Sequence, residues 1–288
     1  MKASLMIVMC TIVHSICVCQ NDNCGFKVSK KSKIDFLSQF ASHTTGRIAV
    51  DTTLFVEVPV VFHVIHDEDI ENITDERILT ELSDLNRDFQ LINTDTSNIP
   101  ASLKGLVGNP NVKFKLASID PNGNSTTGII RKQADRNVYT FKKAIFFADK
   151  IWNPKKYLNV YIGNIRNGKT RGYVNSYPWN NTATDAIGLY YYDVGNSTRL
   201  LTHETGHWFG LWHIIEGGCG TINDGIQDTP KQSSFTRGCP TTKSECGNDC
   251  MFPNYMDYSS CRVAFTKGQV QRVQEVILKF RPSLLPGQ

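Results

Sequence analysis

Three of the seven histidines lie within one eleven-residue segment, HETGHWFGLWH. His203 and His207 are four residues apart, so on a helix their side chains lie on the same face, one turn apart. Gly210 can adopt the positive φ that ends a helix sharply, and His213 follows three residues later. The segment therefore predicts a helix that presents two imidazoles, followed by a turn that brings in a third.

This arrangement of residue types is typical of a metal site. In the pattern His-Glu-x-x-His, the two histidines bind zinc and the glutamate acts as a general base. Glu204 occupies the position of that glutamate, and His213 adds a third nitrogen ligand. Three protein ligands leave the fourth zinc position open for water, as a catalytic site requires. The segment thus predicts one catalytic zinc ion bound by His203, His207 and His213.

The composition is that of a globular chain. Of its 288 residues, 40% are hydrophobic and 20% are charged, which suits one or two domains with a sizeable core. The net charge of +4 is small, and the basic residues form no long runs. Nucleic acid is therefore not expected as a partner.

The N-terminus, MKASLMIVMCTIVHSICVCQ, combines a lysine with an apolar stretch and has no acidic residue. It is short for a membrane span and predicts a secretory signal peptide over residues 1–19, with an uncleaved membrane anchor as the alternative. No other apolar stretch is long enough to cross a bilayer, so no stable membrane association is expected. Four Asn-x-Ser/Thr triplets agree with secretion and are candidate N-glycosylation sites: Asn72, Asn124, Asn180 and Asn196.

Cysteine usage agrees with an extracellular protein. Loss of the signal peptide would leave six of the nine cysteines, and five of these lie after residue 218. In an oxidising compartment, such a cluster indicates disulfides that staple a loop-rich segment. The sequence alone does not decide how these cysteines pair.

The hydrophobic pattern predicts a mixed α/β fold. Strands are expected within residues 56–65, 112–120, 127–133, 157–165, 171–178 and 186–195. Helices are expected within residues 74–93, 139–152, 197–210 and 266–285, with Thr74 and either Ser197 or Thr198 as N-caps. Residues 21–50 and 214–265 show little periodicity. The pattern therefore predicts an α/β upper part, a central helix, an irregular lower part and a final helix.

Motifs outside the histidine segment extend the pattern. A methionine turn after His-Glu-x-x-His-x-x-Gly-x-x-His completes the metzincin signature, and NYMDYSSC supplies Met256. With PVVFHVIH, GGCG, NDGIQDTP, GCP and FTKGQVQRV, the chain resembles the compact pappalysins from about Val56 to its C-terminal helix. The resemblance implies a zincin fold, in which a twisted mixed sheet and two long helices form an upper subdomain up to about residue 210. Residues 211–288 would form an irregular, disulfide-stapled lower subdomain that ends in a helix.

The resemblance also implies roles for single residues. Met256 would lie beneath the three imidazoles as an apolar floor. Tyr258 would stabilise the oxyanion of the reaction, with packing under the site as its alternative role. A structural calcium ion would bind the oxygen-rich turn after Gly220, with a solvated turn as the alternative. The candidate calcium ligands are Asn223, Asp224, Asp228 and Thr229.

The family's two disulfides correspond to Cys219–Cys246 and Cys239–Cys261. This leaves Cys24, within NDNCGFK, and Cys250. A Cys-Gly pair in a prosegment resembles the cysteine switch of metzincin zymogens, in which a thiolate occupies the open zinc position. A Cys24–Cys250 disulfide is the alternative. The expected organisation is a signal peptide (1–19), a propeptide (20–50) and a catalytic domain (51–288).

The expected function is that of a monomeric, secreted zinc endopeptidase, made as a zymogen, which hydrolyses peptide bonds in proteins or peptides. A catalytically silent secreted binding protein with the same fold is the alternative. By analogy with other metzincins, an extended substrate would add to the edge strand near Gly172–Tyr177. The pocket for the residue after the scissile bond would be shaped by residues around Met256 to Arg262.

Overall fold

The computed structural model describes Cys24 and residues 30–41, 50–135, 145–165, 170–174, 184–220 and 223–287. The expected signal peptide, Asn180 and the expected strand continuation at 175–178 lie outside these ranges. Within them, no helix combines the length and the apolar character that crossing a bilayer needs.

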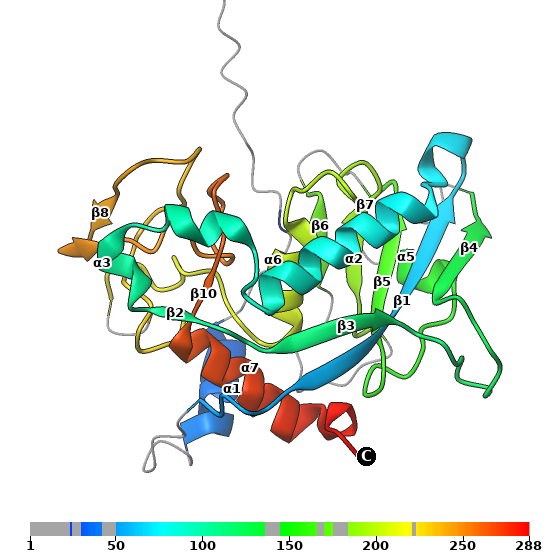
Figure 1. The fold of residues 1–288 in the computed structure, drawn as a ribbon, viewed down its shortest axis with the longest axis horizontal. Helices are drawn as coiled ribbons and strands as arrows, with labels where there is room; N and C mark the ends of the chain where they lie inside the picture. Colours follow the sequence, from blue (N-terminus) through cyan, green and yellow to red (C-terminus); the bar gives the residue numbers. More distant parts are fainter. Residues whose placement is uncertain are drawn as a thin grey trace, which may run out of the picture.

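A six-stranded sheet organises the upper part, in the order β3-β1-β5-β7-β6, with β4 also paired to β1 (Figure 1). Its strands are β1 (Val56–His66), β3 (Val112–Leu116), β4 (Ile129–Gln133), β5 (Leu158–Gly163), β6 (Gly172–Val174) and β7 (Ile187–Tyr190). All neighbours run parallel except β6, which is antiparallel to β7. The sheet is therefore mixed, as predicted, and β6 forms one of its edges.

The long strand β1 lies inside the sheet, and its side chains pack into hydrophobic clusters on both faces. Alternate residues from Val56 to Val64 belong to the main hydrophobic core, whereas Val61 and Ile65 pack into smaller clusters. The near-continuous apolar run that predicted this strand is typical of such a doubly covered position.

Two helices pack on the main-core side of the sheet. Helix α2 (Asp75–Phe89) follows Thr74 as N-cap and contacts β3 and α6 (Leu200–Trp208), and α6 contacts β6 and β7 (Figure 1). The expected N-cap of α6 was wrong. The cap is Arg199 in the left-handed region (φ 54°), because the Arg199 side chain is tied to Asp88 and Asp95.

The lower part has little regular structure until its final helix. Strands β8 (Ser244–Glu245) and β9 (Asn248–Asp249) form a short hairpin, and β10 (Phe265–Thr266) pairs with β2 (Val107–Gly108). Helix α7 (Lys267–Phe280) begins with a capping box between Thr266 and Gln269. The β2–β10 pair connects this part to the upper subdomain, as Figure 1 shows.

The N-terminal segment contains a helix, α1 (Lys30–Ala41), where no periodicity was expected. Phe36 and Phe40, one turn apart, are buried, and both stack against the Arg272 guanidinium of α7. The helix expected within residues 139–152 is described only as α5 (Ile145–Ala148). The remaining short helices are η1 (Asp69–Glu71), η2 (Thr94–Asn98), α3 (Ala101–Lys104) and η3 (Pro282–Leu284).

A buried ion pair joins the end of α7 to the rest of the fold. Arg281 Nη1 lies 2.9 Å from Asp185 Oδ2, and each side chain is only 2% exposed. The Arg281 guanidinium also lies 3.5 Å from the ring centroid of Trp208 and donates to its carbonyl oxygen. These contacts link the C-terminal end of α7 to the histidine helix α6.

Arg281→Ala is expected to lower the free energy of unfolding by about 3–5 kcal/mol, because Asp185 would remain buried without its partner. Lys113→Ala is the control, since it removes an ion pair with Glu57 at the surface and should cost no more than about 1 kcal/mol. Guanidinium denaturation with the disulfides intact measures both values. Equal small losses in the two variants would contradict this role for Arg281.

Candidate active site

The three histidines of the opening segment meet in the interior. His203 and His207 come from α6, and the Gly210 turn (φ +81°) brings His213 back to them. The ring centroids are 4.6–5.2 Å apart, and all three side chains are buried. Among the described residues, only these histidines and Cys24 form a group of three or more potential ligand residues, with ligand atoms within 4.8 Å of one another.

Backbone carbonyls determine which ring nitrogens are available. Nδ1 of His203 lies 2.6 Å from the Tyr255 oxygen, and Nδ1 of His207 lies 2.7 Å from the Leu211 oxygen. Because a carbonyl only accepts, each Nδ1 carries the proton and each Nε2 keeps its lone pair. Burial, and then the nearby His213, lowers the pKa of both rings well below the usual value, which keeps them neutral.

This donor set fits a divalent metal such as zinc. Neutral imidazole nitrogens are zinc ligands, and hydrogen bonds from their other nitrogens hold the rings in place. Nε2 of His203 is buried and has no hydrogen-bond partner, although an orphaned polar atom in the interior is costly. A cation coordinated there would satisfy this atom.

Glu204 lies against the same cluster. Its carboxyl group is fully buried, and burial raises its pKa to about 8. Oε1 has no hydrogen-bond partner, and Oε2 accepts from the Cys24 thiol at 3.7 Å. A carboxylate so placed can exchange protons with a group bound at the histidines, which is the chemistry of a general base.

Cys24 reaches this cluster from the N-terminal segment. Its sulfur lies 3.4 Å from His207 Nε2, and its backbone forms a parallel bridge with Gly172 on the edge strand β6. Cys250 is buried elsewhere as a second free thiol, so the structure does not form the alternative Cys24–Cys250 disulfide. Cys24 therefore occupies both the donor cluster and the sheet edge beside it.

The methionine turn packs against the histidine helix α6. Met256 is fully buried, and its sulfur would lie 2.4 Å from a Cβ on Gly206, so only glycine allows α6 to approach it. The Met256 amide donates to the side chain of Asn254, which exchanges two hydrogen bonds with Gln269. The first turn of α7 therefore holds the methionine turn against α6.

Tyr258 lies at the open side of the cluster. Its hydroxyl is 3.2 Å from His213 Nε2, and its ring stacks on Phe235 at a centroid distance of 3.9 Å. Asp257 supports this side by accepting from the Thr236 amide at 3.0 Å and from Gln232. Sequence reasoning did not single out Asp257, although its place beside the methionine of NYMDY was a possible signal.

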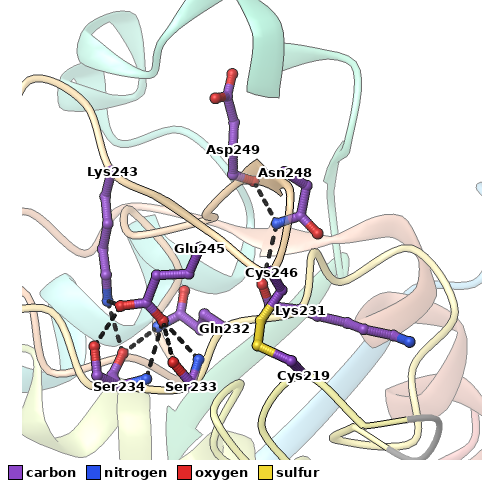
Figure 2. The surroundings of a disulfide bond; sticks show 10 residues. All are labelled: Cys219, Lys231, Gln232, Ser233, Ser234, Lys243, Glu245, Cys246, Asn248 and Asp249. Atoms are coloured by element: carbon purple, nitrogen blue, oxygen red, sulfur yellow. Dashed lines mark hydrogen bonds and ion pairs between the residues drawn. A yellow bond between two sulfur atoms is a disulfide. The ribbon is translucent and has the colours of Figure 1, made fainter.

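The structure forms the two disulfides implied by the family resemblance, Cys219–Cys246 and Cys239–Cys261. Figure 2 shows that Glu245, next to Cys246, accepts hydrogen bonds from Ser233 and Ser234. Burial by itself would raise the pKa of Glu245. The hydrogen bonds from Ser233 and Ser234 outweigh this effect and lower the pKa to about 2. The ionised carboxylate thereby holds the loop that leads directly into Phe235.

The candidate calcium ligands lie in one turn, where Asn223 donates to the Thr229 carbonyl oxygen. Both carboxylate oxygens of Asp228 accept from the start of α7, namely Thr266 Oγ1 and the Gly268 amide. Asn223 makes hydrogen bonds within its own turn. Asp224 is buried with Oδ2 unpaired, and burial raises its pKa to about 8. Calcium at this turn, with these four residues as its ligands, stays a prediction.

The candidate glycosylation sites on described residues are all at the surface. Asn72, Asn124 and Asn196 have exposed side chains. Exposure permits glycosylation without requiring it, so the glycans stay a prediction.

Comparisons with known proteins agree with this geometry. Residues 141–278 match the family model of M43 peptidases that is described as pregnancy-associated plasma protein-A. An extracellular metalloprotease of Colletotrichum graminicola is 45% identical over 91 residues, which cover 30% of this chain and 32% of that protein. The match thus spans about a third of that relative's length. One from Neurospora crassa is 29% identical over 90% of this chain and 89% of its own length.

Solved structures resemble nearly the whole chain. A promirolysin mutant from Tannerella forsythia has a TM-score of 0.78 and 30% identity, and covers 92% of this chain and 97% of its own. Mature mirolysin with a cleaved peptide has a TM-score of 0.69 and 32% identity, and covers 80% of this chain and 98% of its own. With its metzincin-like fold and histidine cluster, the chain therefore belongs to the pappalysin family of metallopeptidases, peptidase family M43.

Proposed function

We propose that this chain is the latent precursor of a secreted, zinc-dependent endopeptidase. The observation that carries the proposal is the buried cluster of three imidazoles with the Glu204 carboxyl beside it. The relatives named extracellular metalloproteases support secretion. A mirolysin structure with a cleaved peptide supports peptide bonds as the target.

The residues divide the chemistry among them. His203, His207 and His213 would hold zinc, which when bound supplies Lewis-acid activation of a water molecule and of the scissile carbonyl. Glu204 would accept a proton from the attacking water and deliver it to the nitrogen of the leaving amine. The Tyr258 hydroxyl would donate a hydrogen bond to the carbonyl oxygen as negative charge develops on it.

The edge strand β6 offers a place for an extended substrate. It pairs on one side with β7, and on the other side its Gly172 bridges to Cys24. An extended peptide can add to such an edge through main-chain hydrogen bonds. A substrate bound along β6 would cross the site where Gly172 approaches the Glu204 carboxyl.

The N-terminal segment would keep the precursor latent. The Cys24 thiol occupies the donor cluster, and α1 anchors the same segment through Phe36 and Phe40. The promirolysin structure covers 92% of this chain and the mature one 80%, which supports a prosegment at the N-terminus. Proteolytic removal of this segment would uncover both the metal site and the β6 edge.

Glu204→Gln is expected to keep about one zinc ion per chain, since the three histidines remain, and to lose about 10²–10⁴-fold in activity. Metal analysis and casein cleavage, with and without a chelator, measure the two quantities after removal of the N-terminal segment. Glu57→Gln, near the partly exposed start of β1, is the matched control. If the wild-type chain binds zinc but cleaves no protein or peptide, the silent binding protein is the correct alternative.

Cys24→Ala is expected to produce a precursor that is active before its N-terminal segment is removed, because the thiol no longer occupies the cluster. The matched control is Cys250→Ala, which removes the other free thiol and should leave latency intact. Peptide cleavage by the uncleaved precursors measures the difference. If both variants instead lost stability without gaining activity, a Cys24–Cys250 disulfide in the secreted protein would explain the result.

A further inference from the structure

A cavity of about 550 Å³ adjoins the candidate metal site. His203, Tyr258 and Cys24 all contribute to its wall. A peptide whose scissile bond lies at Glu204 would direct a neighbouring side chain into this space. The chemistry of the wall therefore bears on which substrate residue is accepted.

Five arginines and four aspartates line the cavity, so its wall carries an excess of positive charge. Each aspartate of the wall forms an ion pair with an arginine of the same wall: Asp84 with Arg87, Asp193 with Arg171, and both Asp88 and Asp95 with Arg199. Two further arginines, Arg237 and Arg262, also line the cavity. Neither of them has an ion pair with a described carboxylate.

Arg262 is the arginine whose charge acts on both Glu204 and His203. Burial raises the pKa of Glu204 and lowers that of His203, and the Arg262 charge makes a smaller contribution that lowers both. Burial lowers the pKa of Arg262 itself, but a guanidinium stays charged at neutral pH. Arg262 therefore places a positive charge beside Glu204 and His203, and the Asp257 carboxylate partly offsets the effect of burial on its pKa.

The hydrogen bonds of Arg262 orient it without neutralising it. Nη2 donates to the Thr198 carbonyl at 2.8 Å, and Nη1 donates to the Asp257 carbonyl at 3.3 Å. A guanidinium has five N–H donors, so donors remain for a ligand. A partly buried cation held this way by neutral acceptors gains most from an anionic partner, and carboxylates match its planar geometry.

We propose that this cavity receives an acidic side chain, aspartate or glutamate, from the substrate residue that follows the scissile bond, with Arg262 as the specificity-determining residue. Arg237, exposed at the surface of the same wall, adds to the attraction. The proposal rests on the proposed endopeptidase function.

Other side chains would fit this wall less well. A lysine or arginine would face Arg262, while every aspartate of the wall already has an arginine partner. An apolar side chain would exclude water from the guanidinium without replacing its hydrogen bonds, which is unfavourable. The expected order of preference is therefore acidic, then neutral, then basic.

The test uses the full-length protein after removal of its N-terminal segment. Internally quenched peptides that differ only in the residue after the scissile bond compare Glu, Gln, Leu and Lys, and mass spectrometry locates each cut. We expect kcat/KM for Glu to exceed that for Gln by about tenfold or more, and that for Lys by about a hundredfold. A preference for Leu or Lys would overturn the proposed specificity and leave the endopeptidase function standing. Failure to cleave any peptide would overturn both.

Charge reversal at the cavity tests the assigned residue. Arg262→Glu should reverse the preference from Glu to Lys, and Arg262→Lys should retain it in weaker form. Arg131→Gln, which changes an arginine that does not line the cavity, should leave the order unchanged. If Arg262→Glu does not fold, the exposed Arg237→Glu is expected to reduce the ratio of Glu to Gln cleavage severalfold. An unchanged acidic preference in the folded Arg262→Glu protein would exclude Arg262 as its cause.

Discussion

Three buried imidazoles must keep unprotonated nitrogens directed at one point, and much of the fold serves this condition. The carbonyl oxygens of Tyr255 and Leu211 accept hydrogen bonds from Nδ1 of His203 and of His207. Both carbonyls lie outside α6, which ends at Trp208. The helix alone therefore cannot orient its own histidines, and the Gly210 turn and the methionine turn have to close on it.

That closure depends on contacts between segments that are far apart in the chain. The methionine turn is held by Gln269 at the start of α7, and Asp228 binds the same end of α7. Disulfides and Glu245 hold the loop that carries Phe235 against Tyr258. The irregular lower part thus gains its rigidity from cross-links and polar contacts, because its sequence has too few apolar residues to build a core of its own.

The sequence predicted correctly those helices and strands whose formation depends mainly on the spacing of their own apolar residues. The spacing of apolar residues located α2, α7 and the buried strand β1, because amphipathic period and burial determine these elements. The N-cap of α6 was predicted wrongly, since Asp88 and Asp95 hold Arg199 in a conformation that its own propensity disfavours. Helix α1 was missed because it lies in a polar segment, in which Phe36, Leu37 and Phe40 are the described side chains that reach the core.

The sequence by itself determined the metal-ligand pattern and the family. On any helix that ends in a glycine turn, the spacing of His203, Glu204, His207 and His213 brings these side chains together. Only the tertiary structure decided which groups surround that pattern. Cys24 reaches the histidines across 183 positions of sequence, and Asp228 accepts hydrogen bonds from the start of α7. Arg262 lines the cavity without an ion pair to a described carboxylate, although the charges of Asp257 and Glu204 act on it. Such pairings depend on distances in space, which sequence spacing does not encode.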